Sequence, residues 1–433
     1  MSAETQGRRA RICFYGIFGQ GNLGNECTLQ AILHHARLFF PQGEFTCICT
    51  GPADTSRRHE IPAVPISWRY ERKGDPVGRR RPRSRLVRWL RRIFVLPPAE
   101  LLDWVRAYRT LKGIDLLIVP GTGLLTDACT SPLGWPYDVF KWSLIAKLRG
   151  CRLAYVSVGA GPVARALSRW FIRSALSMAD FRSYRDESTR DHLKGLGFFR
   201  HADRVCPDLA FSLPQGLTPE PAHDRRRPIV IVGLMSHPGQ LSTQEISPAA
   251  YRAYLLKLAV FCNWLISNDY EVRTMTGDLT YDKGVTEEFR EILRDLAPPG
   301  DDTRLAEAHV SSVGELLSAL ATADLVIATR FHNTLLALAL NKPVIAVAFH
   351  HKSVSLMGGM GLSRFMQDMS DLNVDLLIEQ FAELRTNTQV LKLEIGQRTD
   401  EYRRIVEEQY AAIFGLVRGQ ARRTGKPYRP IPA

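Results

Sequence analysis

The feature that most constrains the fold is a regular alternation of short apolar runs with longer stretches of helical periodicity. Examples of the apolar runs are RICFYG at 11–16, DLLIVP at 115–120 and PVIAVAF at 343–349. Neighbouring parallel strands need a crossover connection, usually a helix, so this alternation predicts parallel sheets covered by helices. We therefore expect an α/β protein.

A proline-rich segment separates two rounds of this alternation. SLPQGLTPEPAHDRRRP at 212–228 contains four prolines and a cluster of charges, which is typical of a linker. With 433 residues, the chain is also long enough for two hydrophobic cores with a cleft between them. We predict an N-terminal domain at 1–215, a linker at 216–228, a second domain at 229–385, and at 386–433 a helix that crosses back to the first domain, followed by a basic tail.

Much of the net charge of +13 is concentrated in an insertion at 69–96. Residues 69–92 contain 11 lysines and arginines but two acidic residues. Between 79 and 96 the apolar residues share one helical face and the arginines the other, which predicts a basic amphipathic helix. Either its apolar face packs on its own domain or the helix binds an anionic membrane surface. A nucleic-acid partner is not expected, because no recognition module accompanies the basic residues.

Composition also predicts the compartment. The chain has no apolar run of the roughly 18 residues that a membrane-spanning helix needs, and its polar N-terminus lacks the apolar core of a secretory signal. Its eight cysteines are scattered without a C-x-x-C pair, which argues against a zinc site. We predict a cytoplasmic protein without a bound metal, peripheral at the inner face of the membrane if the basic helix binds lipid.

The first glycine-rich loop has the spacing of a dinucleotide-binding fingerprint. Gly19, Gly21 and Gly24 follow the apolar run at 11–16 in a G-x-G-x-x-G pattern. A dinucleotide site also needs an acidic residue at the end of the second strand, but that strand ends in Thr-Gly-Pro at 50–52. A nicotinamide cofactor is therefore not expected.

Polar side chains accompany these glycines. Asn25 can cap a helix that starts at Glu26, and Asn22 can occupy a left-handed turn, so both asparagines have structural interpretations. Such a turn also leaves backbone N–H groups and side-chain amides free to bind polar or anionic groups. The candidate substrate-binding residues of this loop are Gly21, Asn22, Gly24, Asn25 and Glu26.

Two further strand ends carry candidate residues. VPGTGLLTDA places Gly121, Gly123 and Asp127 at the carboxyl end of a parallel strand, where α/β proteins usually bind ligands. Asp127 is either a functional group there or a helix cap. Arg185 follows the strand FRSYR and is another candidate, with a surface ion pair to Asp186 as the structural alternative.

The most informative region is DLVIATRFHNTLLALALNKPVIAVAFHHKS at 324–353. Its strand–helix–strand pattern forms a right-handed crossover, which brings the carboxyl ends of both strands to one edge of the sheet. Arg330, His332 and Asn333 at the first end should therefore approach His351 and Lys352 at the second. We expect an anion to bind there, with Arg330 as a bidentate clamp, Lys352 as a compact charge and His332 exchanging a proton near neutral pH.

Taken together, these stretches resemble the polysaccharide pyruvyl transferase family. The matching pieces are, in order, GNLGNE, PGTGLLTD, SVGAGP, SYRDEST, CPDLAFSLP, TRFHN and NKPVIAVAFHHK, within about residues 12–352. The resemblance implies two Rossmann-like domains in a GT-B-like arrangement, with the acceptor side in 1–215 and the donor side in 229–385. It also implies that phosphoenolpyruvate forms a pyruvate ketal on two hydroxyls of a sugar, with release of phosphate.

The resemblance also implies roles for residues. It makes Arg330, His332 and Lys352 the catalytic donor site, and it places the 22–26 loop, Asp127 and Arg185 in the cleft. We hypothesise that His332 is the general acid or base, while Arg330 and Lys352 hold the carboxylate and the departing phosphate. The scheme uses no cofactor and no metal. Its partners are phosphoenolpyruvate and a saccharide acceptor, in a polysaccharide or a lipid-linked oligosaccharide.

Two other functions remain open at this point. A sugar-nucleotide-dependent glycosyltransferase on the same scaffold needs an acidic residue for the nucleotide, for which Glu307 and Glu315 are candidates. A non-catalytic scaffold at the membrane surface would use the basic helix, and its arginine and histidine cluster would be incidental.

Overall fold

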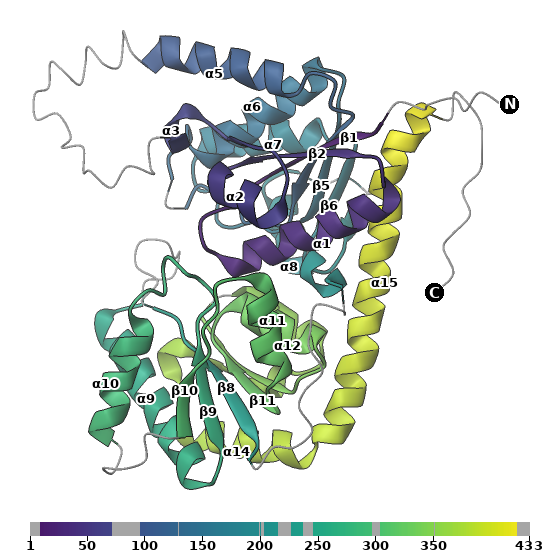
Figure 1. Ribbon diagram of the computed structural model, residues 1–433. Coiled ribbons are helices and arrows are strands. Elements are labelled where there is room, and N and C mark those ends of the chain that lie inside the picture. Colours follow the sequence, from purple (N-terminus) through teal and green to yellow (C-terminus); the bar gives the residue numbers. More distant parts are fainter. Residues whose placement is uncertain are drawn as a thin grey trace, which may run out of the picture.

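The computed structural model describes residues 9–71, 96–128, 130–198, 200, 203–214, 227–236, 246–296, 304–349 and 351–421. Figure 1 shows two lobes, one above the other, with a long helix running along one side of both. Three predicted segments lie largely or wholly outside the described residues: the basic helix at 79–96, the linker at 216–228 and the tail beyond 421. The predicted membrane contact through 79–96 therefore stays a prediction.

The upper lobe is built on a parallel sheet. Within the described residues this sheet has seven strands in the order β3-β2-β1-β4-β5-β6-β7. The strands are β1 (Arg11–Gly16), β2 (Glu44–Cys49), β3 (Ala63–Pro65), β4 (Leu116–Pro120), β5 (Arg152–Val158), β6 (Phe181–Tyr184) and β7 (Arg204–Val205). The helices are α1 (Leu23–Phe39), α2 (Pro52–His59), α3 (Trp68–Glu71), α5 (Leu96–Thr110), α6 (Trp135–Leu148), α7 (Ala166–Ser177), α8 (Glu187–Gly195) and the short 3-10 helix η1 (Leu209–Ser212).

The lower lobe repeats the plan. Its described residues form a six-stranded sheet in the order β10-β9-β8-β11-β12-β13. The strands are β8 (Ile229–Gly233), β9 (Glu271–Met275), β10 (Leu305–Glu307), β11 (Leu325–Ala328), β12 (Val344–Ala348) and β13 (Met366–Asp368). The helices are α9 (Pro248–Ser267), α10 (Val285–Leu296), α11 (Val313–Ala321), α12 (Phe331–Ala339), α13 (His351–Gly359), η5 (Ser363–Phe365), η6 (Met369–Asp371), α14 (Val374–Thr386) and α15 (Thr388–Ala421).

The two sheets share one topology, which determines where a ligand can bind. β1 pairs in parallel with both β2 and β4, and β8 pairs in the same way with β9 and β11. Every residue of the central strands β4 and β8 is buried, as expected for parallel sheets covered by helices. The predicted α/β fold with two Rossmann-like sheets is confirmed. In such sheets the ligand crevice lies outside the carboxyl ends of the strands, where the strand order reverses.

Helix α1 begins earlier than the sequence predicted. Its cap is Asn22, whose side-chain oxygen accepts a hydrogen bond from Asn25 N at 3.2 Å, so Asn25 is not the cap. Asn22 has a φ of −80°, and the left-handed conformations belong to Gly19 and Gly21, with φ of +75° and +84°. Glycine adopts positive φ without steric cost, which leaves the asparagine free to cap.

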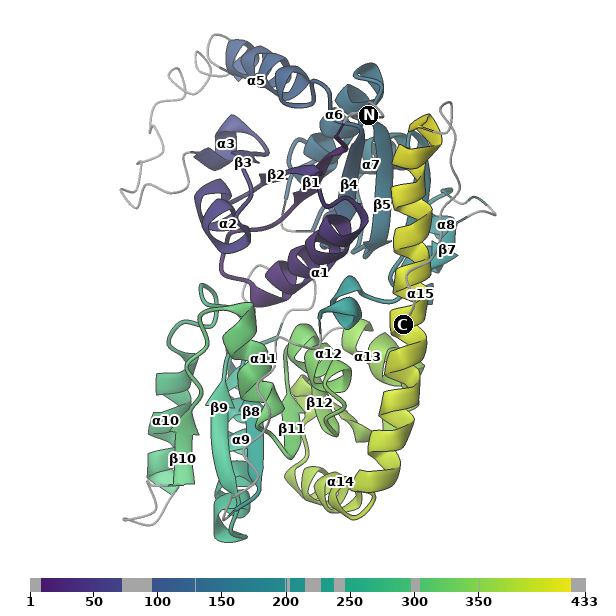
Figure 2. The ribbon, with the colours of Figure 1, turned by 45° about the vertical axis from the view of Figure 1, so that its right-hand side comes forward.

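The long helix α15 joins the two lobes, as both views of the ribbon show (Figures 1 and 2). Its Gln409 side chain donates to Ser157 Oγ of the upper lobe at 3.0 Å. One turn and a half earlier, Arg403 Nη2 donates to the Ala339 carbonyl of the lower lobe at 2.7 Å. The helix therefore fixes the lobes to one another. Among the described helices, none combines the length and the apolar character needed to cross a membrane.

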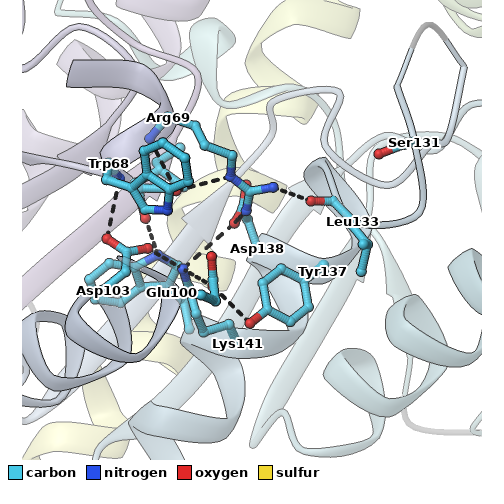
Figure 3. A network of polar contacts seen from close by, with 12 residues as sticks. Trp68, Arg69, Glu100, Asp103, Ser131, Leu133, Tyr137, Asp138 and Lys141 are labelled. Carbon is cyan, nitrogen blue, oxygen red and sulfur yellow. Dashed lines mark hydrogen bonds and ion pairs between the residues drawn. The ribbon is translucent and has the colours of Figure 1, made fainter. Parts of the chain in front are cut away.

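A network of charged side chains, buried at Lys141, Asp103 and Asp138, connects α3, α5 and α6 (Figure 3). The Lys141 side chain is fully buried, and its Nζ lies 2.5 Å from Asp103 Oδ2, 3.4 Å from Glu100 Oε1 and 3.7 Å from Asp138 Oδ1. Asp138 also accepts a hydrogen bond from Arg69 Nη2 at 2.8 Å. Each of these charges has an opposite charge beside it, so the network ties the helices together.

Candidate functional site

An interdomain cavity of about 230 Å³ lies where the carboxyl ends of the two sheets meet. Every strand end that contributes to it is a carboxyl end, because its residues follow β1, β4, β6, β9, β11 and β12. The cavity is lined by Asn22, Gly24, Asn25, Gly121, Gly123, Arg185, Gly277, Arg330, Phe331, His332, Asn333, Phe349, Lys352 and Ser353. Among these described lining residues three are basic, and none carries a carboxylate.

The cavity collects most of the residues that the sequence singled out. Its lining includes the predicted catalytic residues Arg330, His332 and Lys352. It also includes seven of the predicted binding residues: Asn22, Gly24, Asn25, Gly121, Gly123, Arg185 and Asn333. The other four predicted binding residues, Gly21, Glu26, Asp127 and His351, are not among the residues that line it. The carboxyl edges of the two sheets thus face each other across one small space.

The glycines allow the upper lobe to approach the catalytic candidates closely. A Cβ atom added at Gly24 would lie 2.0 Å from His332 Nδ1, which is far inside van der Waals contact. A Cβ atom at Gly123 would lie 3.7 Å from Lys352 Nζ. The backbone at Gly24 therefore forms part of the wall against which the imidazole packs. This close approach gives the glycine a role that does not require a bound dinucleotide.

His332 occupies the first turn of α12, with its imidazole at the junction of the lobes. The side chain is 18% exposed, and its Nε2 has no hydrogen-bond partner among the described residues. Burial, together with the neighbouring Arg185, Lys352 and Arg330, lowers the pKa of His332 to about 4 against the opposing effect of Asp208. The imidazole is therefore neutral near pH 7, and its buried Nε2 is left without a hydrogen bond within the described residues.

Arg330 differs from the sequence expectation. Its Nε and Nη2 both bond to the carboxylate of Asp282, so the bidentate edge of the guanidinium is already occupied. Asp282 is buried and accepts a further bond from Ser236 N at 3.0 Å, which fixes it behind the arginine. The expected bidentate clamp on a ligand is thus not available at this edge. Nη1, which lies 4.0 Å from Asp278 Oδ2, is the nitrogen left for a ligand.

Arg185 and Lys352 supply the other positive charges. The Arg185 side chain is 7% exposed, and its Nε and Nη2 have no hydrogen-bond partner within the described part of the chain. Its guanidinium stacks over the Phe331 ring at 4.7 Å. Burial lowers the pKa of Lys352 to about 8, and the nearby Arg185 adds to this effect. Two cations that line one cavity, with Arg185 Nη2 lacking a hydrogen-bond partner among the described residues, favour a bound anion.

Three of the predicted residues outside the lining have structural contacts instead. Glu26 is buried, where it accepts a bond from Gly19 N at 2.8 Å and lies 2.8 Å from His59 Nε2, so it holds the glycine loop. Asp127 accepts bonds from the backbone N–H groups of residues 164 and 165, both at 2.9 Å, beside the start of α7. This arrangement is the capping alternative considered for Asp127. Gly21 joins the lobes, because its carbonyl accepts a bond from Leu279 N at 2.8 Å.

His351 is the fourth predicted residue outside the lining. It is exposed at the start of α13, one residue before Lys352. Burial lowers the pKa of His351, and Lys352 lowers it further. The structure therefore separates two neighbours in sequence, with the lysine in the cavity wall and the histidine outside it.

The loop after β9 carries functional residues that the sequence interpretation missed. Asp278 accepts a bond from Asn22 Nδ2 at 2.9 Å, and Asp282 orients Arg330. A Cβ atom at Gly277 would lie 2.6 Å from Asn333 Oδ1. The segment TGDLTYDKG follows a predicted strand. Because ligands bind at the carboxyl ends of parallel strands, its position alone marks it as a candidate.

The two acids proposed for the glycosyltransferase alternative do not line the interdomain cavity. Glu307 accepts a bond from Arg290 Nη2 at 2.9 Å. Glu315 accepts bonds from Ser311 N and Oγ, both at 2.7 Å, in the first turn of α11. Both acids therefore have local structural partners.

Solved structures of similar fold include UDP-GlcNAc 2-epimerases. A putative UDP-N-acetylglucosamine 2-epimerase from Listeria monocytogenes matches with a TM-score of 0.59 and 12% identity, covering 98% of this chain and 100% of that one. The UDP-GlcNAc 2-epimerase from Neisseria meningitidis, bound to UDP-GlcNAc, matches with a TM-score of 0.57 and 8% identity, covering 94% and 99%. At such low identity the likeness shows the fold, and it confirms the predicted GT-B-like arrangement.

Sequence comparison identifies the family. Among curated proteins, none matches the chain significantly. The family model of polysaccharide pyruvyl transferases, however, matches residues 22–351, which is most of the chain and includes every residue of the interdomain cavity except Lys352 and Ser353. The chain therefore belongs to the polysaccharide pyruvyl transferase family.

Proposed function

We propose that this protein transfers pyruvate from phosphoenolpyruvate to a saccharide, in a polysaccharide or a lipid-linked oligosaccharide, and forms a ketal. One observation carries the proposal: Arg185, Arg330 and Lys352 converge on a small cavity whose described lining contains no carboxylate. Phosphoenolpyruvate carries a carboxylate and a phosphate on a three-carbon skeleton, so its size and charge suit this space. The family assignment supports a transferase of this type.

The donor would be held by separate groups at its two charged ends. Arg330 Nη1 and Lys352 Nζ bind the carboxylate and the phosphate, and Arg185 Nη2, which has no hydrogen-bond partner among the described residues, adds a further donor. The N-terminus of α12 contributes its partial positive charge at the same place. Positive groups fixed in advance in a partly dry site stabilise the charge of the departing phosphate as well as the bound donor.

The reaction begins with proton transfer to the methylene carbon of the donor. This step makes a methyl group and leaves a cationic centre at the carbon that bears the phosphate, stabilised by its oxygen. A sugar hydroxyl attacks this carbon, the C–O bond to phosphate breaks, and a second hydroxyl of the same sugar closes the ketal. Of the two hydroxyl protons, one balances the new methyl group and the other leaves with phosphate.

His332 is the proposed proton carrier. In the free protein it is neutral, since burial and nearby cations hold its pKa at about 4. It therefore suits the role of base for the attacking hydroxyl, through Nε2. A bound trianion offsets the charges of Arg185, Lys352 and Arg330, which raises the histidine pKa and lets the same nitrogen deliver the proton to the donor.

Phosphate release tests the proposal. The protein is incubated with phosphoenolpyruvate or with nucleotide sugars, each with and without a lipid-linked oligosaccharide acceptor, and the product is examined for a pyruvate ketal by mass spectrometry. We expect phosphate only when phosphoenolpyruvate and acceptor are both present. Sugar transfer from a nucleotide sugar, or no turnover with any acceptor, would overturn it.

His332→Gln tests the proton carrier. We expect kcat to fall by about 10²- to 10⁴-fold, the usual contribution of a general acid or base, while the affinity for phosphoenolpyruvate changes little. His309→Gln is the matched control, because His309 is exposed in the same lobe and does not line the cavity. If H332Q and H309Q turn over equally fast, His332 has no part in the proton transfers.

A further inference from the structure

A second cavity lies directly beside the interdomain cavity, and we call it the α15-side cavity because Tyr402 and Ile405 of α15 line it. Its volume is about 660 Å³, within the range of roughly 300–1,000 Å³ that is common for ligand sites. Arg185, Phe331 and Lys352 line both cavities. The stacked pair of Arg185 and Phe331 therefore forms part of the wall between two adjoining spaces.

Carboxylates distinguish the α15-side cavity from its neighbour. Asp186, Glu187 and Asp191 come from α8 and its cap, and Asp208 comes from the cap of η1. The interdomain cavity has no such group among its described lining residues. The described lining thus carries four carboxylates against two cations, Arg185 and Lys352, so it disfavours a polyanion such as a nucleotide and offers acceptors to hydroxyl groups.

Apolar side chains complete this lining. The rings of Phe211 and Tyr402 meet edge to face, with centroids 5.1 Å apart, and Leu356 lies in the same wall. A sugar ring presents C–H groups on its faces and hydroxyls on its rim. Aromatic and aliphatic surface beside carboxylates matches both kinds of group at once.

Two of the carboxylates are placed at the wall between the cavities. Asp186 and Asp208 each accept a backbone N–H bond through Oδ1, from Thr189 at 2.7 Å and from Ala210 at 3.0 Å. Their Oδ2 atoms lie 3.6 Å from Arg185 Nε and 3.4 Å from Arg185 Nη1. Arg185 is buried and lies in both cavity walls, with these acids on one side, and its Nη2 has no hydrogen-bond partner among the described residues.

Asp208 also connects the α15-side cavity to the proposed proton carrier. Its Oδ2 lies 3.9 Å from His332 Nε2, a separation that one bound hydroxyl can bridge. We propose that the α15-side cavity binds the acceptor as a neutral, hydroxyl-rich saccharide, whose reacting hydroxyls lie between Asp208 and His332. This inference rests on the proposed pyruvyl transfer for its chemistry, but the binding itself can be tested alone.

Filling the cavity tests this assignment. Ser355→Phe places a ring in the lining of the cavity. Val354→Phe puts the same ring on the preceding residue of α13, where Val354 is 47% exposed and outside the lining. Binding of neutral methyl hexosides and of the corresponding uronides is followed by saturation-transfer NMR, and binding of phosphoenolpyruvate by calorimetry. We expect S355F to weaken hexoside binding by roughly tenfold or more. Hexoside binding by V354F, and phosphoenolpyruvate binding by both variants, should stay unchanged.

A surface variant examines the charge of the same cavity without altering its packing. Glu187 and Asp191 are largely exposed, with side-chain exposures of 63% and 62%. Both acids form ion pairs with Arg190. The double variant E187Q/D191N should raise uronide affinity severalfold relative to hexoside affinity, because it removes two like charges and leaves the charge of Arg190 unneutralised. An unchanged ratio would contradict the charge argument even if S355F proved unstable.

The outcomes separate this inference from the proposed function. Equal hexoside binding by S355F and V354F, or uronides that bind wild type more tightly than hexosides, would overturn the acceptor assignment. Pyruvyl transfer by S355F with an unchanged acceptor KM would also overturn it, while leaving the transferase function intact. A third outcome is that S355F loses hexoside binding while wild type never releases phosphate from phosphoenolpyruvate. This result would support the saccharide site and refute pyruvyl transfer.

Discussion

Two lysines of this protein differ in whether the surrounding side chains neutralise their charge. Lys141, in the α3–α5–α6 network, has Asp103, Glu100 and Asp138 within 3.7 Å of its Nζ. In the described part of the chain no ion pair reaches Lys352, and burial together with Arg185 lowers its pKa to about 8. Asp186 and Asp208 oppose this shift without forming an ion pair with the lysine. A buried cation that its own protein neutralises is structural, whereas a cation without an ion pair favours an anion from outside.

The largest effect should come from removing the unpaired lysine. We expect Lys352→Met to lower kcat/KM by about 10³-fold, because a preorganised charge is lost where phosphate departs. Its thermal midpoint should not fall, since no partner in the described residues is left without its counter-charge. Steady-state kinetics and a melting curve measure the two quantities. A lower thermal midpoint for K352M with an unchanged kcat/KM would show that Lys352 is structural and contradict the contrast with Lys141.

The matched change at the paired lysine should act on stability. Lys141→Met leaves the buried Asp103 and Asp138 without their shared cation, which should reduce the free energy of unfolding by about 3 kcal/mol or more. Below its melting temperature the variant should keep most of its activity. Urea titration with wild type and K352M alongside provides the measurement. Equal midpoints for K141M and wild type would show that the network contributes no stability.

A smaller effect on activity is expected at the glycine wall. In Gly24→Ala the new methyl group meets His332 Nδ1, so the imidazole must move. A displacement of about 1 Å at a reacting group can cost 10²-fold, and we expect a loss of that order in kcat. Gly195→Ala is the control, since nothing lies within 4 Å of its added Cβ. Full activity in G24A would mean that the imidazole position is not critical.

The candidate residues whose shared position the sequence predicted correctly are those governed by topology. Arg330, His332 and Lys352 follow successive parallel strands, and a right-handed crossover places such strand ends at one edge whatever the details of packing. The same rule applied to the loop after β9 would have added Asp278 and Asp282. Aspartates in a segment such as TGDLTYDKG also fit ordinary turn positions, so residue type alone does not single them out.

Residues whose role depends on a distant partner could not be predicted in this way. Glu26 lies in the glycine loop, but its carboxylate is held by His59, which is 33 positions away in a helix that the pattern did not predict. Arg330 was expected to bind a ligand in bidentate fashion, but it forms its bidentate contact with the buried Asp282. The short strands β3, β7, β10 and β13 were also missed, since two or three residues are too few to show a period.

The smallest effect expected is the pH dependence of donor binding. With a pKa of about 8 in the free protein, Lys352 loses its proton as the pH rises above that value. Binding of phosphoenolpyruvate should then weaken by up to about tenfold per pH unit, because the anion requires the charged form. Calorimetry from pH 7 to 9 measures it. Lys352→Arg should bind without this dependence, since arginine stays charged throughout.

The stability of the free protein should respond to Lys352 in the opposite direction. Its folded pKa of about 8 lies below the ordinary value of 10.5, so folding disfavours the charged form. Between these two values the unfolded chain binds more protons, and the contribution of Lys352 to stability therefore rises with pH. Wild type should gain stability relative to K352R over this range while its donor affinity falls. If both quantities fell together, Lys352 would be paired within the protein, and the contrast with Lys141 would disappear.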